Sequence, residues 1–167
     1  MNKRGVDILL TTDPSNMNYL TGYDGWSFYV PQGVIISIDE DQPFWFGRKQ
    51  DSNGARITTF LNEENIFGYP EQLIQCPPSH PYDYVVQLFK DKKWSDKNIG
   101  VEMDSYYYTA ENHKRLKNNL RNANFINAHL LINWVRYVKS ENEIKYMKDA
   151  GTLVKAGMTT AFDSIKE

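Results

Sequence analysis

The sequence predicts an α/β fold: a mixed β-sheet flanked by helices and followed by one further helix at the C-terminal end. Three features of the 167 residues lead to this prediction. Short apolar runs, typical of buried strands, alternate with segments whose apolar residues recur at helical spacing. Clusters of glycine, proline, asparagine and aspartate separate these segments. The stretch from residue 140 onward carries a single apolar stripe with helical spacing.

Short apolar segments along the chain are the expected strands. Pro31 interrupts the second segment, which indicates a bulge or an edge position because proline cannot donate to a sheet ladder. The turn residues 39–42 bring the second and third segments together as a hairpin. The expected strands are 6–12, 28–38, 43–47, 65–69, 98–104 and 124–127.

The expected helices lie between these strands. The first has strong end signals: Asp13 can cap it, Pro14 suits its first turn, and Gly22 can end it in a left-handed conformation. The third has an apolar face typical of a helix packed on a sheet. That face consists of Tyr82, Val85, Val86 and Phe89. The expected helices are 13–22, 48–61, 82–92 and 109–120, and residues 76–81 form a proline-rich loop.

The last helix needs a surface to cover its apolar stripe. Ser140 and Glu143 have the spacing of a capping box, so the helix begins there. Either it packs on its own domain or its copy, or it is the first helix of a second domain. No terminating signal follows "DSIKE", which favours the second reading. We expect an N-terminal domain at 1–133, then a linker and this first helix at 134–167. The stripe consists of Ile144, Met147, Gly151, Val154, Met158, Ala161 and Ile165.

Composition excludes several classes of partner. Hydrophobic residues make up 41% and charged residues 24%, as in ordinary soluble proteins. The net charge is −2 and neither sign forms a block, so neither nucleic acid nor a membrane is expected as a partner. Cys76 is the single cysteine, which excludes an internal disulfide and favours the cytoplasm. No apolar run reaches membrane-spanning length, and the N-terminus lacks the pattern of a signal peptide.

The stretch "NYLTGYDGWSFYV" at 18–30 is the strongest candidate for a functional surface. It places Trp26, Phe28 and Tyr29 in a glycine-jointed segment beside Asp24. These side chains are candidates for a substrate pocket or an interface. The alternative is that the aromatic side chains belong to the core, since Trp26 and Phe28 would share one face of a strand. Asp24 is also explained by a turn.

Other residues are weaker candidates. Glu102 and Asp104 could face one way at a strand end, but no histidine or third acid follows at metal-ligand spacing, so no metal site is expected. Cys76 and His80 are close in sequence, yet a loop explains them better than a thiolate nucleophile does. The remaining candidates are explained by structural roles or by positions on a solvated surface, although an arginine could bind a substrate carboxylate. They are His113, His129, Arg48, Lys49 and Arg56.

Two stretches resemble a known family. "VDILLTTDPSNMNYLTGYDG" resembles the opening of the creatinase/prolidase N-terminal domain, which has a ribonuclease H-like fold. "WVRYVKSENEIKYMKDAGTLVKAGM" resembles the junction with that family's catalytic "pita-bread" domain. "GYDGWSFYVPQ" and "FGRKQDSNGA" look most like the ectoine-hydrolase and creatinase-like branch, and less like proline-specific peptidases. The resemblance covers essentially the whole chain. One departure is that only Met1 to Gly5 precede the first strand, where members usually have a helix.

The resemblance implies a two-domain enzyme. Its C-terminal half would bind two divalent metal ions through Asp, Asp, His, Glu and Glu, and a bridging water would attack a C–N bond of a small substrate. None of those ligand motifs lies in residues 1–167, so this chain alone is expected to be inactive and to hold no cofactor. The N-terminal domain would support a homodimer and lean over the partner's active site, with the aromatic loop as a lid or wall. The alternative is a stand-alone binding or dimerisation module.

Overall fold

The computed structural model describes residues 1–165. The chain divides into two compact units, one from Met1 to Ile132 and one from Asn133 onward. The first unit contains the whole β-sheet and the helices packed on it. Among residues 1–165, none of the helices combines the length and apolar character that a membrane crossing requires.

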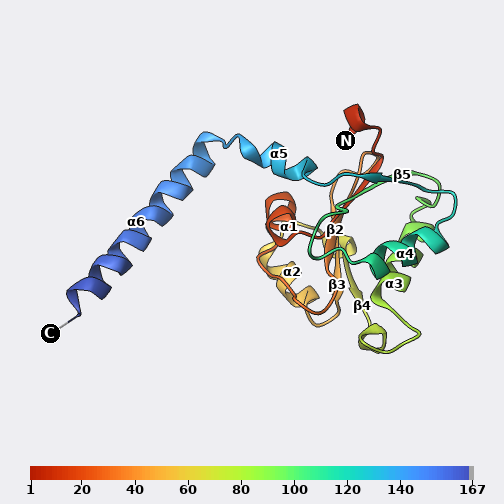
Figure 1. Ribbon diagram of the computed structural model, residues 1–167, viewed down its shortest axis with the longest axis horizontal. Helices are drawn as coiled ribbons and strands as arrows, with labels where there is room; N and C mark the ends of the chain where they lie inside the picture. Colours follow the sequence, from red (N-terminus) through yellow and green to blue (C-terminus); the bar gives the residue numbers. More distant parts are fainter. Residues whose placement is uncertain (166–167) are drawn as a thin grey trace. The chain divides into compact units, whose positions relative to one another are not determined.

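A six-stranded mixed sheet forms the centre of the first unit, which confirms the expected fold class (Figure 1). Its order is β4-β3-β2-β1-β5-β6. The pairs β1–β2 and β2–β3 are antiparallel, and the remaining pairs, β3–β4, β1–β5 and β5–β6, are parallel. The expected hairpin is present as β2–β3. The strands are β1 (Ile8–Thr11), β2 (Gly33–Ser37), β3 (Phe44–Arg48), β4 (Ile66–Tyr69), β5 (Asn98–Val101) and β6 (Asn124–Asn127).

Helices cover both faces of this sheet (Figure 1). On one face, α3 and α4 enclose the largest core cluster, and the expected apolar face of α3 is fully or almost fully buried. On the other face, α1 and α2 pack on the opposite side chains of β2 and β3. Because both faces are covered, consecutive side chains of a central strand are all buried. The helices are α1 (Pro14–Thr21), α2 (Ser52–Thr58), α3 (Pro81–Asp91) and α4 (Ala110–Asn119), with short 3₁₀ turns at Asn2–Arg4, Glu63–Asn65 and Glu71–Leu73.

The ends of α1 follow the sequence signals. The Asp13 side chain accepts hydrogen bonds from the backbone N–H groups of Ser15 and Asn16, at 3.0 and 3.2 Å. Pro14 occupies the first turn. Gly22 ends the helix with φ of 81°, in the left-handed region where a side chain would be strained. Local chemistry therefore sets both ends of this helix.

Three predicted boundaries are wrong. The second strand begins at Gly33, so residues 28–32 form a loop that enters the sheet after Pro31. The second helix covers Ser52–Thr58 only, because a turn that begins at Arg48 precedes it and an extended Thr59 ends it. The fifth strand ends at Val101, where Glu102 turns the chain toward α1. One helix that was not expected, α5 (Leu131–Tyr137), begins in the expected N-terminal domain and ends in the expected linker.

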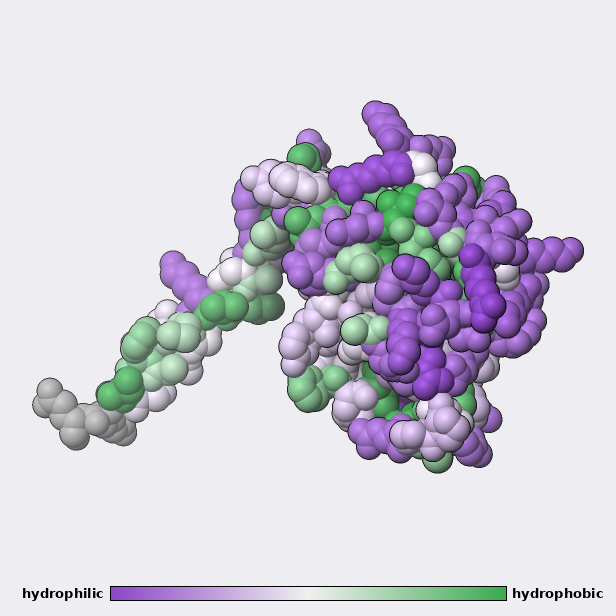
Figure 2. Space-filling view, turned by 45° about the vertical axis from the view of Figure 1, so that its right-hand side comes forward, coloured by the Kyte–Doolittle hydropathy of each residue, from purple (hydrophilic) through white to green (hydrophobic). Residues whose placement is uncertain are grey.

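The second unit is dominated by α6 (Glu141–Asp163). Its capping box is present: the Ser140 hydroxyl accepts from the Glu143 backbone N–H, and the Glu143 carboxylate accepts from the Ser140 backbone N–H at 2.7 Å. No residue of Glu141–Asp163 is buried. Figure 2 shows apolar side chains along the exposed surface of this helix.

Candidate functional site

The aromatic loop, residues 24–32, places large apolar side chains in solvent. Trp26, Phe28 and Tyr29 are 60%, 66% and 61% exposed, so none of them belongs to the core of the domain. The Trp26 and Phe28 rings meet edge to face, with centroids 6.5 Å apart. Such exposed aromatic area is unusual unless it serves a contact with another molecule.

A second segment completes an aromatic cluster of Trp26, Phe28, Tyr106 and Tyr107. Tyr106 stacks on Phe28 with centroids 6.3 Å apart, and Tyr107 meets Trp26 edge to face at 6.4 Å. Sequence reasoning missed both tyrosines. The run "SYYYT" at 105–109, which directly follows a strand end, was the available signal.

Hydrogen bonds hold the aromatic loop on the sheet. The buried Tyr69 hydroxyl donates to the Pro31 carbonyl oxygen at 2.6 Å. The Arg48 guanidinium donates to the Tyr29 hydroxyl at 3.2 Å, while its other contacts are with Glu71. Burial raises the pKa of Tyr69 well above its ordinary value, so its hydroxyl stays protonated and able to donate. The exposed side chains therefore stand on an anchored backbone.

Gln32 links the same loop to α2. Its amide nitrogen donates to the Asp51 carboxylate at 3.1 Å, and its amide oxygen accepts from the Tyr23 hydroxyl at 3.3 Å. Burial, followed by the nearby Asp51 charge, raises the pKa of Tyr23 to about 12. This tyrosine is consequently neutral and keeps its donor role at physiological pH.

Asp24 and Gly25 at the start of the loop, and Gly22 before it, have structural roles. Asp24 is exposed, and its backbone N–H donates to the Thr58 hydroxyl at 3.2 Å, which joins this part of the loop to α2. Gly22 has the left-handed conformation expected of it, whereas Gly25 does not have a positive φ. Gly25 is required for space instead, because a Cβ atom there would lie 2.8 Å from the Tyr23 ring.

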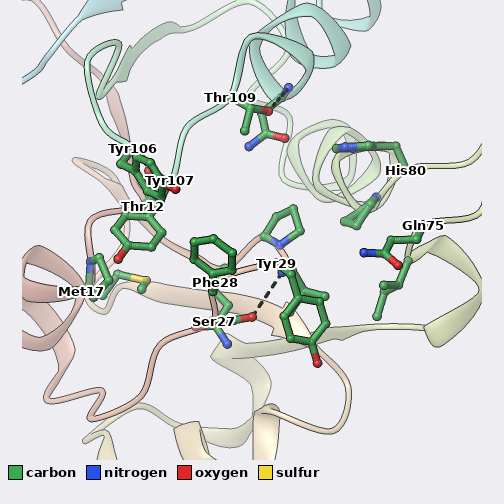
Figure 3. A pocket seen from close by; sticks show the side chains of 17 residues that line it. Thr12, Met17, Ser27, Phe28, Tyr29, Gln75, His80, Tyr106, Tyr107 and Thr109 are labelled. Carbon is green, nitrogen blue, oxygen red and sulfur yellow. Dashed lines mark hydrogen bonds between the residues drawn. The ribbon is translucent and has the colours of Figure 1, made fainter.

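A pocket of about 250 Å³ lies beside the loop, within the first unit. Figure 3 shows Phe28, Tyr106 and Tyr107 on one side of it, His80 and Gln75 on another, and Thr109 at a third. Of the residues expected at a site, Phe28 and Tyr29 line this pocket, whereas Trp26 and Asp24 do not. Asn112, which is only 2% exposed, also lines it.

His80 begins α3 at the edge of this pocket. Its Nδ1 atom accepts a hydrogen bond from the Tyr82 backbone N–H at 3.1 Å, and Asp83 completes a capping box. Burial, and then the Arg115 charge, lower its pKa, so the ring is neutral at pH 7. Since Nδ1 accepts, the proton of the neutral ring is on Nε2, which makes His80 a hydrogen-bond donor.

Glu102 and Asp104 do not act as a pair. Glu102 is 3% exposed, and its carboxylate accepts from the backbone N–H groups of Thr12 and Asp13 and from the Asn16 amide, at 2.7, 3.0 and 2.6 Å. Asp104 lies in solvent and faces His129 at 3.8 Å. Glu102 therefore joins the start of α1 to the end of β5. Among residues 1–165, no group of three or more His, Cys, Asp or Glu side chains could hold a metal ion.

Exposure, a local hydrogen bond or an ion pair accounts for four of the other candidate residues. Cys76 is exposed in its proline-rich loop. The His113 ring bonds to the Tyr108 hydroxyl at 3.1 Å. Arg56 forms an ion pair with Glu63 at 2.7 Å, as Arg48 does with Glu71.

Residues 1–138 match the family model of the creatinase/prolidase N-terminal domain. The chain belongs to this family. Its similarity to the ectoine hydrolase of Halomonas elongata is 46% identity over 95% of this chain and 39% of that protein. An uncharacterized hydrolase/peptidase of Sinorhizobium fredii, y4tM, is 42% identical over 98% of this chain and 42% of its own length. The first of these matches supports the expected ectoine-hydrolase branch. The chain spans about two fifths of the length of these curated relatives.

Solved structures share the fold. The N-terminal domain of a Xaa-Pro dipeptidase from Lactobacillus brevis has a TM-score of 0.65 at 14% identity, over 79% of this chain and 91% of that one. An X-Pro aminopeptidase from Thermotoga maritima has a TM-score of 0.71 at 17% identity, over 99% of this chain and 43% of that one. Identities this low establish the architecture alone.

Proposed function

We propose that residues 1–133 are the non-catalytic N-terminal domain of a dinuclear-metal C–N hydrolase. In this proposal the domain supports a homodimer, and its aromatic loop forms a wall over the active site of the partner subunit. Family membership and the greater length of the matched enzymes support it. The two divalent metal ions would be held by a catalytic domain, because residues 1–165 offer no cluster suited to them. No chemical step is therefore assigned to this chain.

The observation that carries the proposal is the exposure of the aromatic loop on an anchored backbone. Trp26 and Phe28 are mostly in solvent, while Pro31 behind them is fixed by Tyr69. A rigid apolar wall can exclude water from a small polar substrate and orient it without exchanging a proton. The loop would lose little conformational entropy on binding, because hydrogen bonds already fix its backbone.

The substrate of the whole enzyme is proposed to be a small amide, amidine or imino-acid compound. The relative at 46% identity is an ectoine hydrolase, whereas the structural neighbours named for X-Pro or Xaa-Pro peptides are below 20% identical. The closer sequence similarity favours an ectoine-like compound over a proline peptide. Hydrolysis of each type by the full-length enzyme would show which is preferred.

We also propose that α6 is the first helix of the catalytic domain. Ile144, Met147 and Met158 are 43%, 61% and 51% exposed, although their spacing is that of a helix face which packs on a protein surface. The alternative function, a stand-alone binding or dimerisation module, needs no such domain. The reading frame decides between them, since it either continues beyond Glu167 for about a domain length or stops.

A mixed-dimer experiment tests the role of the loop. One full-length protomer carries Trp26→Ala, and the other has an intact loop but a replaced metal ligand in its catalytic domain. If the loop acts on the partner, two nearly inactive proteins regain about one quarter of the wild-type activity after random exchange into dimers. Half of the dimers are then mixed, and each has one complete site. Absence of recovery, with mixed dimers demonstrated by mass, contradicts the proposal.

Chain 1–167 provides the matching control. We expect it to hydrolyse neither dipeptides nor cyclic amidines in the presence of Mn²⁺, Co²⁺ or Zn²⁺. Reproducible metal-dependent turnover by this chain would overturn the assignment of catalysis to another domain.

A further inference from the structure

The ring contacts of the aromatic cluster form a closed circuit. Trp26 contacts Phe28 and Tyr107, Phe28 contacts Tyr106, and the two tyrosine rings meet edge to face with centroids 5.5 Å apart. Tyr106 is 75% exposed, more than Trp26 and Phe28. Two separate loops thus bring four rings together, and each ring limits the movement of its neighbours while most of the aromatic surface stays in solvent.

The two segments that form the cluster carry acidic residues and no basic side chain of the lysine or arginine type. Residues 5–47 and 98–113 contain neither lysine nor arginine. Asp24 and Asp104 are both exposed, and they stand two positions before Trp26 and Tyr106. The Arg48 guanidinium, which reaches the loop at Tyr29, is paired with Glu71 at 2.7 Å. Aromatic faces with acidic neighbours favour a positively charged ligand.

The pocket beside the cluster offers room for the rest of such a ligand. Among the described residues, its lining includes no aspartate, glutamate, lysine or arginine. Figure 3 shows Phe28 and the two tyrosines on one side, and His80 and Thr109, where α3 and α4 begin, on others. Because helix starts carry partial positive charge, a cation would lie at the aromatic side. The volume of about 250 Å³ restricts the ligand to metabolite size.

We propose that the aromatic cluster binds a small organic cation with an alkylated ammonium group. The group would lie on the exposed faces of Trp26 and Tyr106, since the face of an aromatic ring is negative and tryptophan attracts cations most strongly. Its alkyl carbons spread the charge and cover apolar ring surface, so little hydration is lost. The inference goes beyond the proposed function, because it requires neither a partner subunit nor a catalytic domain.

Choline and 3,3-dimethylbutan-1-ol, measured against chain 1–167 by NMR titration, test the role of the charge. The two probes have the same shape, but one has a quaternary nitrogen where the other has a neutral carbon. We expect choline to bind at least about fivefold more tightly. Equal affinities of the two probes would overturn the proposal.

The indole N–H signals show where choline binds. Trp45 and Trp94 are buried, at 0% and 3% exposure, whereas Trp26 and Trp134 are 60% and 63% exposed. Trp134 also contacts a tyrosine, Tyr137, but the Lys139 ammonium already lies 5.7 Å from the centroid of that ring. Choline should therefore shift the Trp26 signal and leave the Trp134 signal in place. The opposite pattern would show that the cluster is not the site.

Trp26→Leu removes the aromatic face and keeps an apolar side chain. Choline affinity should fall about fivefold, to the level of the neutral probe, whose own affinity should stay within about twofold. Trp26→Phe should restore part of the loss, and Trp134→Leu, the matched control, should cause none. If Trp26→Leu binds choline as the parent chain does, the assignment is wrong. That result would leave the mixed-dimer test unaffected, because that test measures hydrolysis by the full-length enzyme.

Discussion

Strand β3 and the aromatic loop each carry three large aromatic side chains, but only those of β3 are buried. Phe44, Trp45 and Phe46 are between 0% and 1% exposed, whereas Trp26, Phe28 and Tyr29 are between 60% and 66% exposed. β3 has a paired strand on each side and helices over each face, so every side chain meets a neighbour. The loop is fixed through its backbone and through Tyr29, Gln32 and their partners. Its Trp26 and Phe28 rings meet each other and the rings of Tyr107 and Tyr106, and stay mostly in solvent.

This contrast shows that aromatic density alone does not locate a core. The difference lies in contacts made over long sequence distances, which composition does not record. The aromatic side chains of β3 stabilise the fold by packing in the core. Those of the loop form an exposed apolar surface that another molecule can contact. Substitutions in the two regions should therefore act on different measurements: the free energy of unfolding for β3, and catalytic efficiency of the full-length enzyme for the loop.

Phe46→Ala should produce the largest effect on stability. The Phe46 ring meets Tyr82 edge to face and lies so close to Gly33 that a Cβ there would be 2.5 Å from it. Removing a fully buried phenylalanine costs about 3–5 kcal/mol, a large part of the stability of a domain. Urea denaturation of chain 1–167 should show this loss. A loss below about 1 kcal/mol would remove the energetic distinction between the two regions.

Glu102→Gln should have the next largest effect. The substitution removes the carboxylate charge and replaces one accepting oxygen with an NH2 group. That group would face either the Asn16 amide or the backbone N–H groups of Thr12 and Asp13, at a cost of about 2–3 kcal/mol. Asp104→Asn, only two residues away in solvent, is the control and should change stability by less than about 0.5 kcal/mol. If Glu102 were a metal ligand instead, Mn²⁺ or Zn²⁺ would raise the unfolding temperature of the parent chain; we expect no such shift.

The pH dependence of α3 is a smaller test. The folded-state pKa of His80 lies below the ordinary value of 6.5, through burial and the Arg115 charge, with Asp83 and Glu111 opposing. The unfolded chain therefore binds the proton more readily, and stability should fall as pH drops below about 6.5. His80→Asn, whose side chain takes up no proton in this pH range, should flatten part of this fall. His113, whose pKa is also lowered, should contribute to the fall in the same pH range. An unchanged pH profile would contradict the capping role of neutral His80.

Trp26→Ala should have the smallest effect on stability, less than about 1 kcal/mol, because the side chain is mostly in solvent. The unfolding midpoint in urea measures it directly beside Phe46→Ala. A loss comparable to that of Phe46→Ala would show that Trp26 stabilises the fold as a core residue does, and would contradict its assignment to an exposed surface.

Local signals in the sequence were enough for much of the fold. The ends of α1 and the apolar face of α3 depend on residues within one or two turns, so they could be predicted. The false strand at 28–32 arose because the segment is apolar; Pro31 accepts from Tyr69, 38 residues away, rather than from a neighbouring strand. The role of Glu102 was equally hidden, since its partners are 86 to 90 residues earlier in the chain.

Contacts between distant parts of the chain also limited the prediction of the candidate site. The sequence drew attention to Phe28 and Tyr29, which line the pocket, because their segment is dense in aromatic residues. It missed Tyr106 and Asn112 and assigned His80 only to a loop. Each of these comes from a different element, and only the packing of α3, α4 and the loop on the sheet brings them to one pocket.

The most direct test of the central claim compares two exposed phenylalanines in the full-length enzyme. Phe28 and Phe60 are 66% and 62% exposed, but only Phe28 belongs to the aromatic cluster and the pocket. Phe28→Ala should lower kcat/KM more than tenfold, about 1.4 kcal/mol of transition-state binding, with little change in unfolding temperature. Phe60→Ala should leave both unchanged. Equal catalytic efficiency of the two variants, both folded, would contradict a functional role for the aromatic loop.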